Sequence, residues 1–255
     1  MIAKNFDYRS EDITCEGYLA YEESSNIKRP GVLVVPNWMG VGDFVKEKCE
    51  TLASLGYIAL AVDVYGKGVR PKDREEAAKL SSYYKENYLI LRKRLKDALN
   101  AIKTVDLVKD DYIGAIGYCF GGTAVLELAR SNEDIKGVVS FHGGLATLDI
   151  NRNPIKAKIL VCHGVDDPFV PMSQVEAFIK EMNERKADYQ IIMYADAVHS
   201  FTEKAAGNDK SKGTAYNELA DKRSWNHMLL FFQEIFRRLK QKEYTNQKIR
   251  TKRRN

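Results

Sequence analysis

The stretch that most restricts the fold of this chain is residues 111–130, where an apolar run, a glycine-flanked cysteine and a helical pattern follow one another. Its centre reads Gly117-Tyr118-Cys119-Phe120-Gly121, which predicts a strand, a tight turn and a helix. Glycine is needed on both sides of such a turn, because a side chain at either position would collide with the backbone. Cys119 is therefore expected at the apex of the turn.

The place of Cys119 in this turn also favours chemical reactivity. Its sulfur is expected near the first turn of the following helix, where unpaired N–H groups and the positive end of the helix dipole stabilise a thiolate. Most free cysteines are small buried apolar residues, and that reading competes with the reactive one. A cysteine held between two glycines in a strand–helix turn has little packing role, so the sequence favours a nucleophile.

Strands and helices alternate along the rest of the chain. Beyond the strand before Cys119, strands are predicted at residues 6–8, 14–21, 31–36, 58–64, 136–141, 157–163 and 189–194. Helices are predicted after Cys119 and at residues 43–55, 73–83, 86–104, 173–186 and 217–240. The helix at 43–55 has Asp43 as its predicted N-cap and Gly56 as its stop. This order predicts an α/β fold with a mostly parallel, doubly wound sheet flanked by helices, and an N-terminal antiparallel edge hairpin.

The domain prediction is a single α/β domain over residues 1–243, because no Pro/Gly/Ser-rich linker interrupts the chain. The net charge is +5, but residues 240–255 hold seven basic side chains and one acidic one, so the rest of the chain is slightly acidic. Residues 244–255 are predicted to be a basic, disordered tail. The folded body therefore offers no electrostatic argument for a nucleic-acid partner.

The chain carries no signal for a membrane or for a metal. No apolar run approaches the ~20 residues of a membrane-spanning helix, and residues 1–10 lack the apolar segment of a signal peptide, so we expect a cytoplasmic protein without a membrane partner. Four cysteines are scattered without a C-x-x-C pair, so neither a metal site nor a disulfide framework is indicated. The oligomeric state has no signal in the sequence.

A cysteine nucleophile needs a base, and the base needs a third group that orients it. Open parallel sheets place functional residues just past the carboxyl ends of their strands. One strand leads into Asp166-Asp167 and the next into His199, so cysteine, acid and histidine follow in the chain order of the α/β-hydrolase fold. The N–H of Phe120, directly after Cys119, is expected to stabilise an oxyanion.

Four motifs in register resemble those of the dienelactone hydrolase family: G-Y-C-F-G-G at 117–122, H-G-V-D-D-P-F-V-P at 163–171, H-S-F at 199–201 and A-Y-N at 215–217. The resemblance runs from about residue 31 to 236. It implies an α/β-hydrolase fold with Cys119 as nucleophile and His199 as base. The family spacing G-x-x-D-x-x-V fits Asp167 and not Asp166, and by resemblance the backbone N–H of Trp38 is the second oxyanion donor.

Other residues of the strand-exit loops are candidates for the substrate pocket, namely Asn37, His142 and Phe201. The sequence favours structural roles for His142, His163 and His227, although His142 and His163 end strands near the site and either could line it. In the dienelactone-cleaving members, a glutamate stands where this chain has Asn37, and an arginine stands where it has Glu203. The resemblance therefore implies weak activity on dienelactone and a preference for neutral substrates.

The function expected from these observations is hydrolysis of a small ester, lactone or thioester by an enzyme that needs neither a metal nor an organic cofactor. Two other readings stay open at this point. One is a generalist carboxylesterase or peptidase on the same scaffold. The other is a binding protein that keeps the fold without activity, since a fold alone does not establish catalysis.

Overall fold

The computed structural model describes residues 1–23 and 27–252, and side chains up to residue 236. Its centre is an eight-stranded sheet in the order β1-β2-β4-β3-β5-β6-β7-β8. The strands are β1 Ile2–Ser10, β2 Ile13–Tyr21, β3 Arg29–Val35, β4 Ile58–Ala61, β5 Val108–Tyr118, β6 Gly137–Phe141, β7 Lys158–Gly164 and β8 Tyr189–Tyr194. β1 and β2 are antiparallel and the six strands from β4 to β8 are parallel, as predicted.

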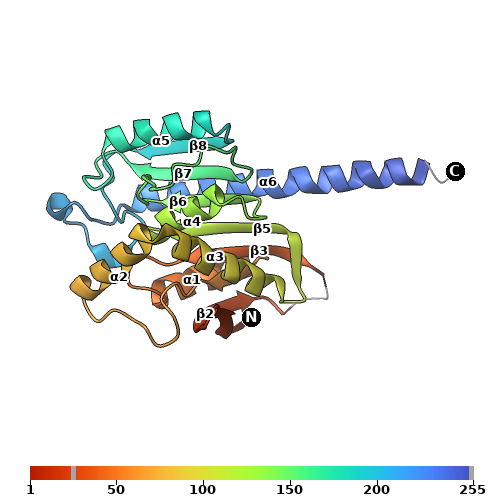
Figure 1. Ribbon diagram of the computed structural model, residues 1–255, viewed down its shortest axis with the longest axis horizontal. Helices are drawn as coiled ribbons and strands as arrows, with labels where there is room; N and C mark the ends of the chain where they lie inside the picture. The colour runs from red at the N-terminus through yellow and green to blue at the C-terminus, as the bar shows by residue number, and fades with distance from the viewer. Residues whose placement is uncertain (24–26, 253–255) are drawn as a thin grey trace.

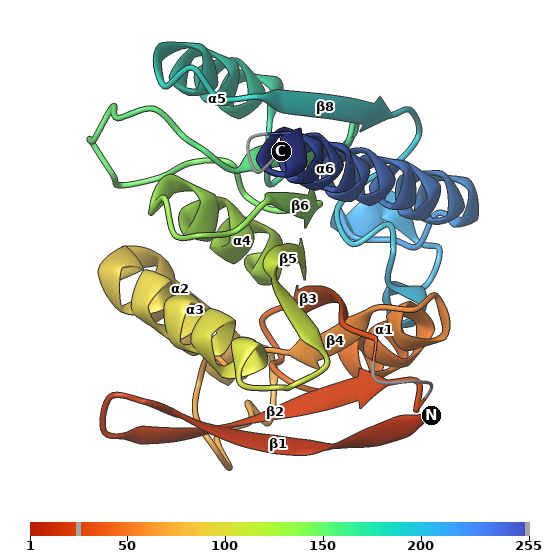
Figure 2. The ribbon, with the colours of Figure 1, turned by 90° about the vertical axis from the view of Figure 1, so that its right-hand side faces the viewer.

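Helices cover both faces of this sheet (Figures 1 and 2). α3 Tyr88–Lys103, α4 Phe120–Arg130 and α5 Met172–Glu184 lie on one face, with α2 Arg74–Glu86 against α3. α1 Asp43–Ser54 and α6 Glu218–Lys252 lie on the other. The central strands are buried on both faces and therefore consist of continuous apolar runs, such as residues 31–35. The fold is thus the predicted doubly wound α/β arrangement.

Two helix boundaries differ from the prediction. Gly42, and not Asp43, occupies the N-cap of α1, where Asp43 instead places its negative charge in the first turn. α6 was predicted to end near residue 240, but its backbone is helical to Lys252 and includes most of the basic segment predicted to be disordered. No glycine or proline occurs between residues 218 and 252 to end the helix. Residues 253–255 lie outside the described residues.

Among residues 1–23 and 27–252, no helix is both long enough and apolar enough to cross a bilayer.

The parallel strands direct the loops after β3, β5, β6, β7 and β8 to one edge of the sheet. That edge holds the candidate site.

Candidate active site

Cys119 forms the turn between β5 and α4 and has a left-handed backbone conformation, with φ of 54° and ψ of −115°. Few residues other than glycine adopt a positive φ, so the turn is strained. The flanking glycines are required as predicted. A Cβ on Gly117 would lie 2.0 Å from the carbonyl oxygen of Gly121, and one on Gly121 would lie 2.2 Å from that of Val35. These contacts bring the start of α4 directly against the end of β3.

The Cys119 side chain is the first member of a chain of hydrogen bonds. Its Sγ lies 3.1 Å from Nε2 of His199, and Nδ1 of His199 lies 2.8 Å from Oδ2 of Asp167. The other carboxylate oxygen of Asp167 accepts the backbone N–H groups of Phe169 and Val170, at 2.9 and 3.2 Å. Asp167 is buried whereas Asp166 is exposed, so the structure brings together Cys119, His199 and the aspartate that the spacing favoured.

His199 has a strongly altered protonation equilibrium in this arrangement. Burial alone would lower the pKa of its imidazole, but the hydrogen bonds to Asp167 and Cys119 outweigh burial and raise the pKa to about 10. The ring is therefore protonated at neutral pH, with one N–H directed at Asp167 and the other at the sulfur. At 3.1 Å from the sulfur, Nε2 is close enough to exchange a proton with the Cys119 side chain.

The other three cysteines have the opposite environment. Cys15, Cys49 and Cys162 are all fully buried, whereas Cys119 is partly exposed. Burial raises the pKa of Cys15 to about 11 and that of Cys162 to about 12, and it raises the pKa of Cys49 as well. These thiols are neutral and shielded from reagents in the folded protein.

Phe120 and Trp38, the two residues whose N–H groups were predicted as oxyanion donors, line the same cavity as Cys119. Phe120 begins α4 and Trp38 follows β3, and in the described part of the chain neither N–H donates a hydrogen bond. Asn37 shapes the second donor, because its side-chain oxygen accepts the N–H of Met39 at 2.9 Å. The hydroxyl of Tyr65 donates to the carbonyl oxygen of Trp38 at 2.8 Å. These two contacts hold the peptide that follows Trp38, and the N–H of Gly40, which donates to the carbonyl oxygen of Asn37 at 3.1 Å, holds the peptide that carries the Trp38 N–H.

A cavity of about 460 Å³ lies over these groups and is lined by Cys119, His199, Trp38 and Phe120, and by Lys85, Thr123, Ala146 and Phe169 among others. Its volume is in the range of small-molecule sites. A second space, of about 880 Å³, adjoins it on the side of Ser200 and Phe169, which line both. Within residues 1–23 and 27–252, no cluster of three or more His, Cys, Asp or Glu side chains is arranged to hold a metal ion.

Asn37 and Glu203 lie in the second space and contact one another. The amide of Asn37 donates to Oε2 of Glu203 at 2.6 Å, and burial raises the pKa of the Glu203 carboxyl. The sequence identified both positions, but it contained no signal that they pair, because 166 residues separate them. Glu203 is thus held beside the candidate site and not inside the cavity that contains Cys119.

His142 and Phe201 do not line the pocket, contrary to the prediction. Both are fully buried and have no surface to present to a substrate. His142 packs behind the turn instead, where its Nδ1 accepts the N–H of Cys119 at 3.2 Å and its Nε2 lies 2.8 Å from Oγ1 of Thr202. Burial and the neighbouring His199 lower the pKa of His142, which remains neutral.

The two remaining histidines have the structural roles expected for them. His163 is buried at the end of β7, and burial lowers the pKa of its ring. His227 is on α6, and its Nδ1 lies 2.8 Å from the hydroxyl of Tyr194. Neither side chain reaches the cavity over Cys119, so His199 is the histidine to consider for catalysis.

The sheet order, the strained turn after β5 and the loops at the strand ends define an α/β-hydrolase fold. Residues 15–236 match the model of the dienelactone hydrolase family, and the chain belongs to that family. It is a hydrolase of the dienelactone hydrolase type.

Comparison with individual proteins agrees with this assignment. The chain is similar to the crystal structure of the dienelactone hydrolase-like promiscuous phosphotriesterase P91 from metagenomic libraries, with 36% identity, a TM-score of 0.87, and coverage of 92% of this chain and 98% of that chain. An uncharacterized protein of Caenorhabditis elegans is 38% identical over 57% of this chain and 94% of its own length. A protein of Bradyrhizobium named as a probable 2-oxo-3-(5-oxofuran-2-ylidene)propanoate lactonase is 29% identical over 79% of this chain and 82% of its own length.

Proposed function

We propose that this protein hydrolyses small carboxylic esters or lactones through an acyl-enzyme on Cys119. The observation that carries the proposal is the hydrogen-bonded chain from the Cys119 sulfur through His199 to Asp167. In the first step the thiolate attacks the carbonyl carbon, and the negative charge that develops on the oxygen is stabilised by the N–H groups of Phe120 and Trp38. The protonated His199 then gives its Nε2 proton to the leaving alkoxide, and a thioester remains on Cys119.

The second half of the reaction regenerates the thiol. His199, now neutral, takes a proton from a water molecule, and the resulting hydroxide attacks the thioester carbonyl. The tetrahedral intermediate collapses with release of the carboxylic acid, and the thiolate and the protonated imidazole form again. Asp167 keeps Nδ1 of His199 protonated throughout, so that Nε2 faces the sulfur. Its own orientation comes from the N–H groups of Phe169 and Val170.

The charges around the cavity favour a neutral substrate. Glu203 lines the space next to His199, and the four acidic side chains of that space are matched by four basic ones, so it offers no net positive charge to an anionic ester. Lys85 lines the opposite side, but it is exposed and therefore solvated and screened. We expect kcat/KM for a neutral ester to exceed that for an anionic ester of equal size about tenfold. Equal values, or a preference for the anion that Lys85→Gln removes, contradict this expectation.

Turnover of p-nitrophenyl acetate tests the proposal. Cys119→Ala is expected to lose at least about 10³-fold in kcat, since the covalent route is removed. Cys162→Ala, at a buried thiol on β7, provides the matched control and keeps activity. Mass spectrometry of the protein quenched during turnover is expected to find an acetyl group on the peptide that contains Cys119. Turnover that persists in Cys119→Ala rejects the mechanism, and an inactive native protein supports a binding role.

Neutral phosphotriesters are a second candidate class of substrate. This class is favoured by the similarity to P91, which covers 92% of this chain and whose name includes phosphotriesterase activity. Chemically, the thiolate attacks phosphorus as it attacks a carbonyl carbon, a phosphoryl–sulfur bond forms, and an aryloxide leaves. Incubation with paraoxon is expected to release p-nitrophenol in the native protein and not in Cys119→Ala.

A proteolytic assay with casein tests whether the protein is a peptidase, and we expect no cleavage.

A further inference from the structure

A third cavity, of about 330 Å³, adjoins the cavity over Cys119 on the side away from His199. Lys85, Thr123 and Ala146 line both cavities, so the two spaces lie directly next to each other. The walls come from α2, α3, the first turn of α4 and the loop of residues 142–157 between β6 and β7. A group bound at Cys119 therefore has room to extend into this space, which we call the side cavity.

The lining of the side cavity suits an uncharged apolar group. Leu91, Leu148 and Tyr88 provide carbon surface, and Thr123 and Thr147 add small side chains. Lys85 and Glu86 also line it, but both are exposed to solvent. Glu127, the buried carboxylate of the lining, is already engaged, because Arg92 lies 2.7 Å away and Arg130 3.1 Å away. A paired and buried carboxylate offers no binding energy to an ion, so the cavity selects for alkyl or aryl groups.

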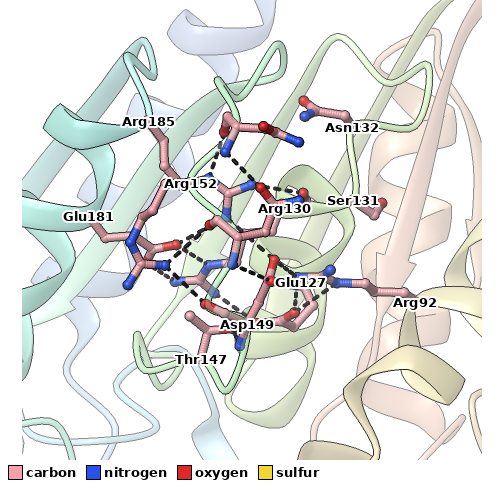
Figure 3. A network of polar contacts seen from close by, with 12 residues as sticks. Arg92, Glu127, Arg130, Ser131, Asn132, Thr147, Asp149, Arg152, Glu181 and Arg185 are labelled. Atoms are coloured by element: carbon pink, nitrogen blue, oxygen red, sulfur yellow. Dashed lines mark hydrogen bonds and ion pairs between the residues drawn. The ribbon is translucent and has the colours of Figure 1, made fainter.

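The loop that closes the side cavity contains no helix or strand, yet buried ion pairs hold it in place (Figure 3). Asp149 accepts from Arg92 at 2.8 Å and lies 3.6 Å from Arg185. Arg130 donates to the carbonyl oxygen of Leu145 at 2.8 Å. Glu181 then binds Arg130 through both oxygens, at 2.9 and 2.7 Å.

Three guanidinium groups and three carboxylates thus balance one another in this network, and removal of any one would leave a net buried charge. The cavity is preformed, so a ligand does not have to order the loop when it binds. Buried ion pairs thus fix the conformation of this loop, which forms one wall of the space beside Cys119.

The orientation of the reaction decides which part of the substrate occupies the side cavity. His199 must lie next to the leaving oxygen that it protonates, so the leaving group occupies the side of Ser200 and Phe169. The acyl group then points the other way, toward Thr123 and Ala146. We propose that the side cavity is the acyl-chain pocket of the enzyme and that the preferred substrates are esters of medium-chain aliphatic or aryl acids. This inference rests on the proposed acyl transfer to Cys119.

The length of the acyl chain is the variable that tests the inference. At roughly 30 Å³ for each water-sized group, the side cavity accommodates about ten such groups, which is enough for a hexanoyl or octanoyl chain. Each methylene that leaves water is expected to raise kcat/KM by about fourfold. With p-nitrophenyl acetate, butyrate, hexanoate and octanoate, we expect kcat/KM to rise at least about tenfold from acetate to hexanoate.

Two exposed residues of the same loop provide a matched pair of variants. Leu148 lines the side cavity and is 61% exposed, whereas Ile150 is 89% exposed and lines neither cavity. Leu148→Glu places a charge in the proposed pocket and is expected to reduce the hexanoate-to-acetate ratio of kcat/KM at least about tenfold. Ile150→Glu is expected to leave that ratio unchanged. Ser82→Trp, which fills the same cavity from α2, is a second variant with the same expected loss.

The outcomes separate this inference from the proposed function. Acetate turnover that depends on Cys119, combined with a flat chain-length profile, rejects the acyl pocket and leaves the mechanism intact. A rising profile that Leu148→Glu and Ser82→Trp do not change also rejects it. For a protein without turnover, calorimetry with Cys119→Ala and the intact esters gives the decision. Tighter binding of hexanoate than of acetate, lost in Ser82→Trp, supports the pocket, and equal binding rejects it.

Discussion

At Cys119 the backbone φ is 54°, and the same left-handed conformation recurs at His142, with 40°, and at Ser200, with 59°. Each such residue costs about 1–3 kcal/mol unless the surroundings hold it. The surroundings here are specific contacts: the N–H of Cys119 is shared between the carbonyl oxygen of Phe141 and Nδ1 of His142. Three of the seven non-glycine residues with positive φ in the described part of the chain are therefore next to the sulfur and the imidazole that the proposed reaction uses.

At the scale of a single residue, we predict that Cys119 is the reactive thiol. In the native protein at neutral pH, iodoacetamide is expected to alkylate Cys119 at least about 10²-fold faster than the other three cysteines. The reason is that those thiols are buried and burial raises their pKa, to about 11 for Cys15 and about 12 for Cys162. Peptide mapping over time measures the order, and earlier labelling of Cys49 or Cys15 with retained activity contradicts it.

The two neighbouring aspartates give a second prediction at this scale. Asp167→Asn is expected to lower kcat by up to about 10⁴-fold, because the amide no longer holds the tautomer of His199, while Asp166→Asn, at an exposed position, changes it less than twofold. Equal losses from the two variants contradict the assignment.

The pH profile of the same variants provides an independent readout. The protonated His199 is the form that donates to the leaving group, so kcat/KM is expected to fall as the pH rises through about 10, the pKa of that ring. Asp167→Asn removes a contact that raises this pKa, and it is expected to move the alkaline limb to lower pH. The stability that protonated His199 contributes follows the same sign: it is present below the ordinary histidine pKa of about 6.5 and is lost as the pH approaches 10.

At the scale of elements, the contact between the start of α4 and the end of β3 positions both proposed oxyanion donors. Gly121 lets the helix approach, since a Cβ there would lie 2.2 Å from the carbonyl oxygen of Val35 and 2.5 Å from that of Pro36. A backbone clash of this size cannot be relieved by a side-chain rotation. The absence of a side chain at Gly121 therefore sets how closely Phe120 and Trp38 approach each other.

We predict from this contact that Gly121→Ala destabilises the protein by about 3 kcal/mol or more and removes most of the activity. Thermal unfolding is expected to show a decrease in Tm of roughly 6–12 °C. Gly42→Ala is the control, because a Cβ there meets nothing within 4 Å. As the N-cap of α1, Gly42 is expected to cost only about 1 kcal/mol when replaced. Similar losses from the two variants contradict the account of α4.

At the scale of the whole molecule, the carboxyl ends of parallel strands gather groups that are distant in sequence. β5, β7 and β8 lead into Cys119, Asp167 and His199, and β6, which lies between β5 and β7, leads into His142 behind them. α6 covers the opposite face of the sheet from α4, with Phe231, Phe232, Ile235 and Phe236 in the core. The candidate site therefore lies at the carboxyl ends of the strands, whereas α6 contributes to the core on one face of the sheet.

The separation predicts how the molecule tolerates truncation. Deletion of the residues after Lys242 is expected to leave Tm and small-ester turnover unchanged within error, because the core side chains of α6 among the described residues, Phe231, Phe232, Ile235 and Phe236, all precede the deleted segment. Deletion after Leu230 removes four buried aromatic and aliphatic side chains and is expected to prevent folding. A decrease of several degrees in Tm for the shorter deletion contradicts the prediction and indicates that the terminal part of α6 contributes to the folded body.

The amino-acid sequence by itself determined the strand–turn–helix around Cys119, the antiparallel hairpin and the parallel sheet. These features follow from local patterns: paired glycines, alternating or continuous apolar runs, and loops at regular intervals. The order of Cys119, Asp167 and His199 was visible for the same reason, since each follows its own strand. Asp167 was preferred over Asp166 because it fits the spacing of the family motif that the chain resembles, and in the structure it is the aspartate that contacts His199.

Only the tertiary structure decided what surrounds these residues. The sequence placed His142 and Phe201 at the substrate, but packing buries both and turns His142 toward the N–H of Cys119. The pairing of Asn37 with Glu203 and the side cavity beyond Thr123 likewise join segments far apart along the chain. Such contacts leave no periodic trace in a sequence, because they depend on how the loops after different strands meet once the sheet has formed.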